Sequence, residues 1–215
     1  MRKVIVAPSV LSCDKSDFRG EVEKVVEAGA KFIHLDIMDG KFVQNSTSLI
    51  EYLPLISDLR VFRDTHIMVR DIKFYVDVYA PYSDCLTFHL EASNDVRGDI
   101  AYIRSKGVKV GISIKPDTPA SALFPYLGDI DLALVMSVEP GKGGQGYIPS
   151  STGKIGALRE AIDAGGYSCL LSVDGGINGL TGALARESGA DVLVAGSYIY
   201  GHPDFRERIK ALLGD

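Results

Sequence analysis

The sequence predicts an α/β fold in which strands and helices alternate along the chain. Short apolar runs recur between segments whose apolar residues have helical spacing. Glycines stand at the ends of several of these helical segments, where a helix end takes the left-handed conformation. Repeated strand–helix units produce parallel strands with right-handed crossovers. The expected architecture is therefore either an open doubly wound sheet or a closed (β/α)8 barrel.

Eight apolar segments are the candidate strands of this fold. They occupy residues 4–8, 32–38, 61–68, 85–88, 109–114, 132–136, 169–173 and 192–195. Apolar residues recur every three or four positions in 17–28 and 154–164, which predicts amphipathic helices there, and 204–213 is predicted to be the final helix. Four glycines stand where helix ends are expected: Gly29, Gly107, Gly165 and Gly189.

The length of the chain fits one barrel. Eight strand–helix units in 215 residues leave about 27 residues for each unit, and such barrels begin at roughly 200 residues in total. No linker, low-complexity tract or shift in composition divides the chain. A single (β/α)8 barrel domain spanning residues 1–215 is therefore expected.

The composition excludes several classes of function. The chain carries 23 Lys and Arg against 28 Asp and Glu, a net charge of −5, which argues against a general affinity for nucleic acid or anionic membranes. No apolar run approaches the roughly 20 residues that span a bilayer. The three cysteines, Cys13, Cys85 and Cys169, form no C-x-x-C pair, which indicates a reducing compartment and excludes a cysteine-based zinc cluster. A cytoplasmic protein is expected.

Polar residues on the strands predict a metal site. Side chains alternate along a strand, so His34, Asp36 and Met38 share one face of the second strand, as do Asp64, His66 and Met68 on the third. Asp174 stands at the carboxyl end of the seventh strand. Strand carboxyl ends form the active-site face of a barrel. His34, Asp36, His66 and Asp174 can therefore converge on one divalent cation, Zn²⁺ or else Mn²⁺, Fe²⁺ or Co²⁺. The alternative is a buried ion-pair network without metal.

Three glycine-rich turns predict a phosphate site. They follow the sixth, seventh and eighth strands and contain Gly141-Lys142-Gly143-Gly144, Gly175-Gly176 and Gly196-Ser197. Glycine lets backbone N–H groups approach an anion closely, and barrel phosphate sites commonly use the last loops. The alternative for each turn is plain chain reversal. Lys142 either adds charge to such a site or is simply solvated.

Seven short segments, taken together, resemble the ribulose-phosphate 3-epimerase family. They are PSVLS at 8–12, HLDIMDG at 34–40, HIM at 66–68, MSVEPG at 136–141, GGQ at 143–145, VDGG at 173–176 and AGS at 195–197. They occur in the order typical of the family and cover the chain from Pro8 to about Gly201. The resemblance implies a (β/α)8 TIM barrel of the ribulose-phosphate-binding type.

The resemblance also implies a function and a set of roles. The enzyme would interconvert D-ribulose 5-phosphate and D-xylulose 5-phosphate by two-base proton transfer through an enediolate, as part of carbohydrate metabolism in the pentose phosphate pathway. One divalent metal ion per subunit would be held by His34, Asp36, His66 and Asp174. Asp36 and Asp174 would be the acid/base pair. The substrate would contact Ser9, His66, Met38, Met68, Met136, Gly141, Lys142, Gly143, Gly144, Gly175, Gly176, Gly196 and Ser197. A homo-oligomer, either a dimer or a hexamer, is implied as well.

Two departures from the family pattern leave the substrate open. Gln44 stands where proline is usual, and Lys142 stands where an aromatic residue is usual. A related ketose phosphate such as D-allulose 6-phosphate is therefore an alternative substrate, and a non-catalytic sugar-phosphate-binding barrel is an alternative of another class. A decarboxylase related to the orotidine-monophosphate enzymes is disfavoured, because its motif needs lysine where Met38 stands. His89, expected to be an ordinary satisfied histidine, and His202 and Lys115 are given no role.

Overall fold

The computed structural model describes residues 3–214, so Met1, Arg2 and Asp215 of the expected domain lie outside the described part. Its strands form one curled sheet with the order β1-β9-β8-β7-β6-β5-β4-β2-β3. Eight of them run parallel: β1 (Ile5–Pro8), β2 (Phe32–Asp39), β4 (Phe62–Met68), β5 (Cys85–His89), β6 (Lys109–Ile114), β7 (Leu132–Met136), β8 (Leu170–Asp174) and β9 (Val192–Ala195). The short β3 (Ser46–Thr47) pairs antiparallel with the end of β2.

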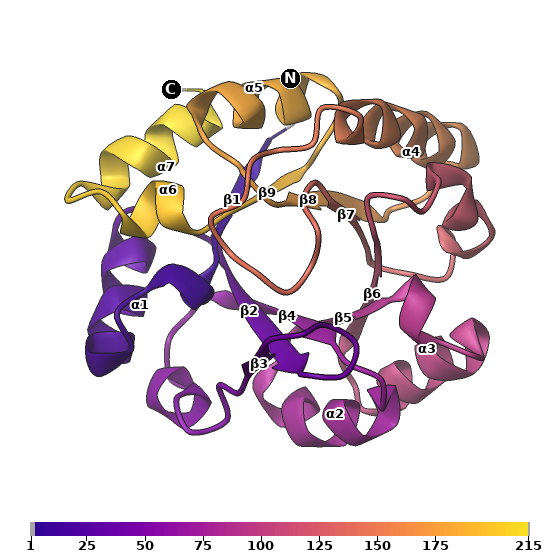
Figure 1. Ribbon diagram of the computed structural model, residues 1–215, viewed down its shortest axis with the longest axis horizontal. Coiled ribbons are helices and arrows are strands. Elements are labelled where there is room, and N and C mark those ends of the chain that lie inside the picture. The colour runs from indigo at the N-terminus through magenta and orange to yellow at the C-terminus, as the bar shows by residue number, and fades with distance from the viewer. Residues whose placement is uncertain (1–2, 215) are drawn as a thin grey trace.

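The sheet closes on itself, which confirms the barrel and excludes the open sheet. β1 pairs in parallel with β9, with Ile5 opposite Val192. On its other side, Ser9 directly after β1 forms a parallel bridge with His34 of β2. Figure 1 shows the resulting ring of strands viewed down its axis, with helices outside it. The fold is a (β/α)8 barrel.

Helices surround the ring but do not fill every crossover. They are α1 (Phe18–Glu27), α2 (Ile72–Tyr79), α3 (Val96–Ser105), α4 (Ser151–Gly165), α5 (Gly179–Glu187), α6 (Ser197–Tyr200) and α7 (Phe205–Leu213). Between β2 and β4 the described chain forms β3 and the 3₁₀ turn η3 (Leu53–Ile56) but no α-helix, and between β6 and β7 it forms only the 3₁₀ turns η6 (Ala120–Ala122) and η7 (Phe124–Tyr126). The prediction of eight strand–helix units is wrong at these two crossovers. Pro54 and Pro125 stand in the first turn of η3 and η7, where the missing N–H interrupts no helical hydrogen bond, so proline alone does not account for the short turns.

Further 3₁₀ turns and glycine caps complete the connections. The turns are η1 (Val10–Ser12), η2 (Lys15–Asp17), η4 (Ala80–Tyr82) and η5 (Leu90–Ala92). Gly29, Gly107 and Gly189 take positive φ after helices, as expected. The cap expected at Gly165 lies one residue later, because α4 includes Gly165 and Gly166 takes the left-handed φ of 64°.

Alternation along β2, β4 and β5 separates an apolar layer from a polar one. Ile33, Leu35 and Ile37 of β2 are fully buried in the layer between the sheet and the helices. The alternate residues face the barrel interior, where imidazole, carboxylate and hydroxyl groups gather on β2, β4 and β5. Burying such groups is costly unless they find partners, so this side of the interior must be organised by hydrogen bonds.

Candidate active site

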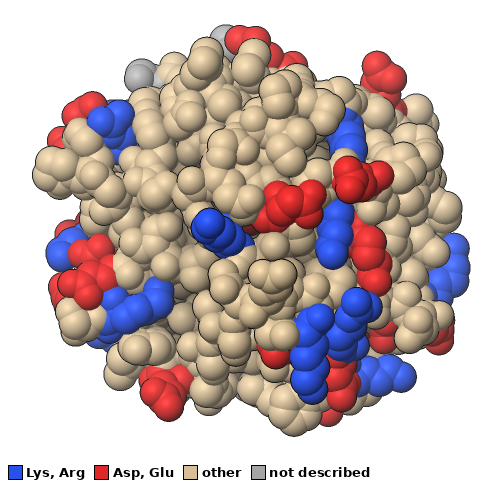
Figure 2. Space-filling model, viewed as in Figure 1, with Lys and Arg blue, Asp and Glu red and all other residues tan. Residues whose placement is uncertain are grey.

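A pocket of about 320 Å³ opens at the carboxyl ends of the strands. Figure 1 shows the loop between β7 and α4 crossing over the middle of the ring. In Figure 2 basic and acidic side chains are interspersed on this face, consistent with the small net charge of the chain. Within residues 3–214, no helix combines the length and apolar character needed to cross a bilayer.

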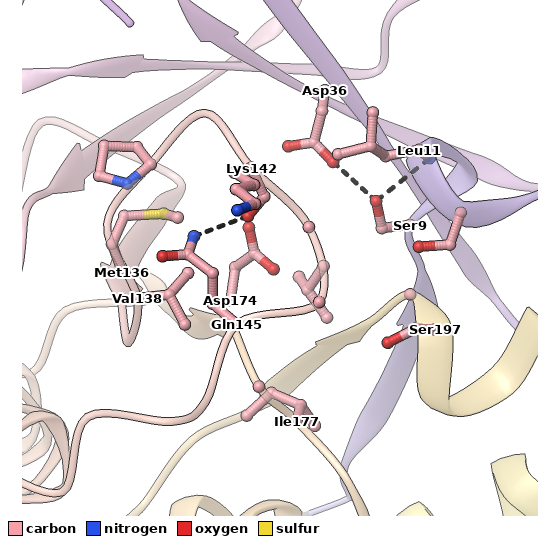
Figure 3. A pocket seen from close by; sticks show the side chains of 18 of the residues that line it. Ser9, Leu11, Asp36, Met136, Val138, Lys142, Gln145, Asp174, Ile177 and Ser197 are labelled. Carbon is pink, nitrogen blue, oxygen red and sulfur yellow. Dashed lines mark hydrogen bonds between the residues drawn. The ribbon is translucent and has the colours of Figure 1, made fainter. Parts of the chain in front are cut away.

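Most residues assigned to the site from the sequence line this pocket. They are Ser9, Asp36, Met38, Met68, Met136, Gly141, Lys142, Gly143, Gly144, Asp174, Gly175, Gly176, Gly196 and Ser197. Figure 3 shows Asp36 and Asp174 among the side chains around it. His34 and His66 are fully buried and do not belong to the lining. Gln44 is exposed and lies outside the lining as well.

Four side chains meet at the base of the pocket. One donor atom from each of His34, Asp36, His66 and Asp174 lies within 4.8 Å of the other three. The strand register brings them together, because Asp36 of β2 stands directly opposite His66 of β4. Asp174 reaches the same point from the end of β8, on the other side of the ring.

His34 is oriented for a cation. Its Nδ1 lies 2.9 Å from Oδ2 of Asp64, a carboxylate that can only accept, so this nitrogen carries the proton in the neutral ring. Asp64 is held in turn by the hydroxyl of Thr87, which donates to Oδ1 at 3.1 Å. His34 Nε2 is buried and makes no hydrogen bond. It lies 3.4 Å from Asp36 Oδ1 and 3.9 Å from Asp174 Oδ2.

This arrangement fits a metal ion. The lone pair of His34 Nε2 faces two carboxylates and has no other partner, which is the geometry of a metal-ligating imidazole backed by a carboxylate. Two imidazole nitrogens and two carboxylates form a donor set that suits divalent transition metals. The cluster can therefore hold a metal ion.

The carboxylates of Asp36 and Asp64 also favour a positive charge at His34. Burial lowers the pKa of His34, but the neighbouring Asp36 and Asp64 carboxylates outweigh it and raise that pKa above its usual range. A proton on His34 or a divalent cation would satisfy the same negative field. The two compete for the cluster, since a coordinating imidazole must be neutral.

Asp36 and Asp174 are driven in opposite directions. Burial disfavours the charge on Asp36, but His34 and His66 prevail and hold the pKa of this carboxyl well below its usual range. Burial and the charge of Asp36 together raise the pKa of Asp174 to about 6. Two carboxyls whose pKa values are separated in this way suit one proton acceptor and one proton donor.

Ser9 fixes the second oxygen of Asp36. Its hydroxyl donates to Asp36 Oδ2 at 2.6 Å, a buried hydrogen bond that is visible in Figure 3. Asp36 Oδ1 meanwhile faces His34 Nε2 at 3.4 Å and His66 Nδ1 at 3.3 Å. The two oxygens of this carboxylate therefore have different surroundings, one toward the cluster and one toward the pocket wall.

His66 continues into a chain of buried polar groups. Its Nε2 lies 2.9 Å from Nε2 of His89, whose Nδ1 lies 3.2 Å from Oε2 of Glu91. Burial lowers the pKa of His89 to about 4, so the ring is neutral at pH 7. His89 is satisfied, as expected from the sequence, but one of its partners is a member of the metal-fitting cluster.

The glycine-rich turns have two different physical reasons for glycine. At Gly176, φ is +62° and a Cβ would lie 2.4 Å from the backbone nitrogen of Tyr147, so chain packing alone excludes a side chain. At Gly144, φ is +72° but nothing lies within 4 Å of such an atom. The space beside Gly144 is open, as an anion cradle requires.

Side-chain amides of Asn45 and Gln145 hold the loop after β7 in place through hydrogen bonds. Asn45 donates its side-chain amide to the carbonyl of Gly141 at 2.7 Å, which ties the loop to the segment after β2. The amide of Gln145 donates to the carbonyls of Glu139 and Lys142, each at 2.7 Å. Lys142 is exposed at the rim of the pocket.

Three residues that support the cluster have no assigned role in the sequence analysis: Asp64, His89 and Glu91. The alternation on β4 does place Asp64 on the face of His66, but it does not show that Asp64 bonds His34. The pairing of His66 with His89 depends on contact between β4 and β5, and no spacing within one strand reveals it.

The chain matches the model of a family described as the ribulose-phosphate 3 epimerase family over residues 5–200. The ribulose-phosphate 3-epimerase of Bacillus subtilis is 38% identical over 214 residues, which cover 97% of this chain and 98% of that protein. The enzyme of the same name from Methanocaldococcus jannaschii is 40% identical over 210 residues, covering 96% of this chain and 88% of its relative.

Solved structures show the same fold at low sequence identity. A mutant tryptophan synthase α-subunit from Pyrococcus furiosus has a TM-score of 0.71 at 16% identity and covers 100% of both chains. A 3-hexulose-6-phosphate synthase has a TM-score of 0.68 at 16% identity, covering 100% of this chain and 99% of the other. At such identities the likeness concerns the barrel alone.

Proposed function

This chain belongs to the ribulose-phosphate 3-epimerase family, and from that premise we propose that its pocket interconverts D-ribulose 5-phosphate and D-xylulose 5-phosphate. The chain is an enzyme, an epimerase. The observation that carries the assignment of residues is the pair Asp36 and Asp174, which share one pocket and whose pKa values are shifted in opposite directions.

Epimerisation beside a ketone requires a proton to leave one face of a carbon and another to arrive on the opposite face. Two groups on opposite sides serve this better than one. Asp36 comes from β2 and Asp174 from β8, and both lie in the pocket lining. We assign them as the two bases, with an enediolate between the proton transfers.

The environments of the two carboxyls set their proton states. Asp36 is held ionised and would take the proton, while Asp174, whose pKa is raised to about 6, is the carboxyl of the pair that more readily carries and returns one. The assignments exchange in the reverse direction. Ser9 keeps the Asp36 carboxylate in place through its hydrogen bond to Oδ2.

His34, Asp36, His66 and Asp174 would hold one divalent cation per subunit. We propose Zn²⁺ first, and Mn²⁺, Fe²⁺ or Co²⁺ as alternatives compatible with the same donors. When bound, such a cation supplies positive charge that stabilises the negative charge developing on the substrate oxygens.

Residues around the pocket would orient the substrate and exclude water. Met38, Met68 and Met136 are buried in its lining and present thioethers without competing proton donors. The loops containing Gly141 to Gly144, Gly175-Gly176 and Gly196-Ser197 would hold the phosphate through backbone N–H groups. Lys142 at the rim would add positive charge beside them.

Lys142 also supports a second candidate substrate. It lines the pocket at a position where the family usually has an aromatic residue, so the distal part of the substrate meets a different surface. A hexulose phosphate such as D-allulose 6-phosphate is the alternative. We further propose a cytoplasmic homo-oligomer, a dimer or a hexamer.

Turnover of purified protein on pentulose 5-phosphates and hexulose 6-phosphates tests the proposal. We expect kcat/KM for D-ribulose 5-phosphate to exceed that for D-allulose 6-phosphate by at least about tenfold, because an added carbon must displace the phosphate from its loops. In D₂O the product should carry solvent deuterium at the inverted carbon. A preference for the hexulose would reassign the substrate, and inversion without deuterium uptake would contradict the two-base assignment.

A further inference from the structure

His66 has one ring nitrogen that the proposed reaction does not use. Nδ1 faces the cluster, 3.3 Å from Asp36 Oδ1, whereas Nε2 points away and lies 2.9 Å from Nε2 of His89. Two imidazole nitrogens at this distance share one proton, so one ring must donate and the other accept. The direction of that bond decides whether the lone pair of His66 faces the cluster.

Glu91 settles the direction. Its carboxylate oxygen Oε2 lies 3.2 Å from Nδ1 of His89 and can only accept, so Nδ1 of His89 carries the proton. A ring with its single proton on Nδ1 offers a lone pair at Nε2, and His89 has no exposed surface at which water could replace its partners. When His66 presents a lone pair to the cluster through Nδ1, its proton is on Nε2, and Nε2 of His89 is the acceptor that this arrangement needs.

Glu91 is itself held in place by a neighbouring loop. Its other oxygen, Oε1, accepts from the backbone N–H of Lys115 at 2.8 Å and from the hydroxyl of Thr118. The ammonium of Lys154 on α4 fastens the same loop by donating to the carbonyls of Lys115, Pro116 and Thr118. The hydrogen-bonded chain thus runs from β4 through β5 and the loop after β6 to α4.

The ring of Phe42 packs against His89 and helps to separate this chain of hydrogen bonds from water. The Phe42 ring lies 4.8 Å from the His89 ring, and the ammonium of Lys115 stands 4.2 Å from the centre of the Phe42 ring. His89 has no exposed surface, so water does not compete for its nitrogens. Glu91 is partly exposed but both of its carboxylate oxygens have partners, and a network whose members are satisfied is rigid.

The two imidazoles of the cluster are supported differently. His34 donates directly to a carboxylate, Asp64, whereas His66 reaches its carboxylate, Glu91, only through a second imidazole. We propose that His89 and Glu91 are positioning residues that fix the ring and tautomer of His66 and thereby set the metal affinity of the site. This inference rests on the proposed metal role of the cluster.

Metal affinity of variants at position 89 tests the proposal. In His89→Leu the Nε2–H of His66 loses its acceptor, while in His89→Gln a side-chain carbonyl can still accept. We expect Zn²⁺ binding to stripped protein, measured against a chelating dye, to weaken about 10- to 100-fold in His89→Leu. His89→Gln should recover most of the loss. The visible spectrum of Co²⁺-loaded protein should change in His89→Leu and return toward that of the unsubstituted protein in His89→Gln.

Two further variants distinguish a specific loss of Zn²⁺ affinity from a general loss of stability. Ser83→Ala removes a buried hydroxyl that bonds Thr65 and the carbonyl of Tyr79, away from the cluster, and should lower stability without changing Zn²⁺ affinity. Glu91→Gln should weaken Zn²⁺ binding in the same direction as His89→Leu, because one carboxylate oxygen is replaced by an NH₂ donor that must face either His89 Nδ1–H or the N–H of Lys115. It serves as the decisive variant if His89→Leu does not fold.

The outcomes separate this inference from the function on which it rests. Absence of Zn²⁺ binding by the unsubstituted protein would overturn both the metal role and the inference. Tight binding by that protein together with equal affinity in folded His89→Leu or Glu91→Gln would overturn the positioning role alone. A loss in Ser83→Ala as large as that in His89→Leu would also overturn it, since the effect would then follow from stability.

Discussion

At the scale of single residues, Asp36 and Asp174 show how surroundings give two identical side chains different proton affinities. Asp36 lies between two imidazoles and accepts from Ser9, which keeps it ionised. Asp174 is partly buried and faces the charge of Asp36, and both its desolvation and that charge raise its pKa. Their proposed roles in proton transfer follow from this contrast.

Replacing either carboxyl by its amide should abolish epimerisation while the protein stays folded. An amide neither takes nor returns the proton, and general acid–base groups contribute about 10²- to 10⁴-fold to rates. We expect Asp36→Asn and Asp174→Asn each to lose at least about 10²-fold in kcat, measured by coupled assay at saturating metal. Circular dichroism checks the fold. Either variant keeping most of its turnover would refute the assignment.

The raised pKa of Asp174 has a consequence for stability. A carboxyl whose folded pKa of about 6 exceeds its usual 3.8 stabilises the fold below pH 4, and this contribution is lost as the pH rises through 6. In chelator-treated protein, Asp174→Asn should therefore be more stable than the unsubstituted chain at pH 8, by about 1 to 3 kcal/mol. Urea unfolding at pH 8 and at pH 4 measures this. A difference that does not shrink at pH 4 would contradict it.

The residues of the cluster could be chosen from the sequence, whereas their supports could not. Alternation within β2 and β4 places His34, Asp36 and His66 on the interior face, and this depends on one strand at a time. The bonds from His34 to Asp64 and from His66 to His89 cross between strands. They depend on register and ring orientation, which spacing along one strand does not determine.

At the scale of elements, the loops after β7 and β8 meet above the ring. Gly176 lies so close to the backbone of Tyr147 that neither loop can change its conformation without moving the other. The strands themselves were predictable, and β6, β7 and β9 have the expected bounds because each is a short apolar run. The two-residue β3 and the 3₁₀ crossovers were not predictable, since elements this short leave no periodic pattern in the sequence.

Alanine at two glycines should separate backbone strain from crowding. Gly144 and Gly176 both have positive φ, but only at Gly176 would a Cβ meet the chain, 2.4 Å from Tyr147 nitrogen. We expect Gly144→Ala to cost about 1 kcal/mol in unfolding free energy and Gly176→Ala at least about 1 kcal/mol more. Urea midpoints measure both. Equal costs would show that the loops move apart freely.

At the level of the whole molecule, the ring of strands closes where the first strand of the chain pairs with the last. β1 lies between β9 and the bridge to β2, so the first and last strands are neighbours in space. Figure 1 shows α7 and α1 side by side at this junction. We propose that residues 1–215 form one domain, because no part of the ring can close without the other.

Truncation tests this closure. A chain ending at residue 190 lacks β9, α6 and α7, which leaves edges on β1 and β8 and uncovers apolar surface. We expect it to lack near-ultraviolet circular dichroism and a cooperative unfolding transition. A truncated chain that melts cooperatively as a monomer would mean that the remaining strands form a domain of their own.

Four side chains from three strands, two of them the proposed bases, are proposed to hold one cation. Metal-stripped protein titrated with Zn²⁺, with bound metal and epimerase rate followed in the same samples, measures whether they do. We predict that turnover rises in proportion to bound metal and saturates at one ion per subunit, and that His34→Ala loses both together. Full turnover of exhaustively stripped protein, or unchanged binding of one ion by His34→Ala, would refute the metal site.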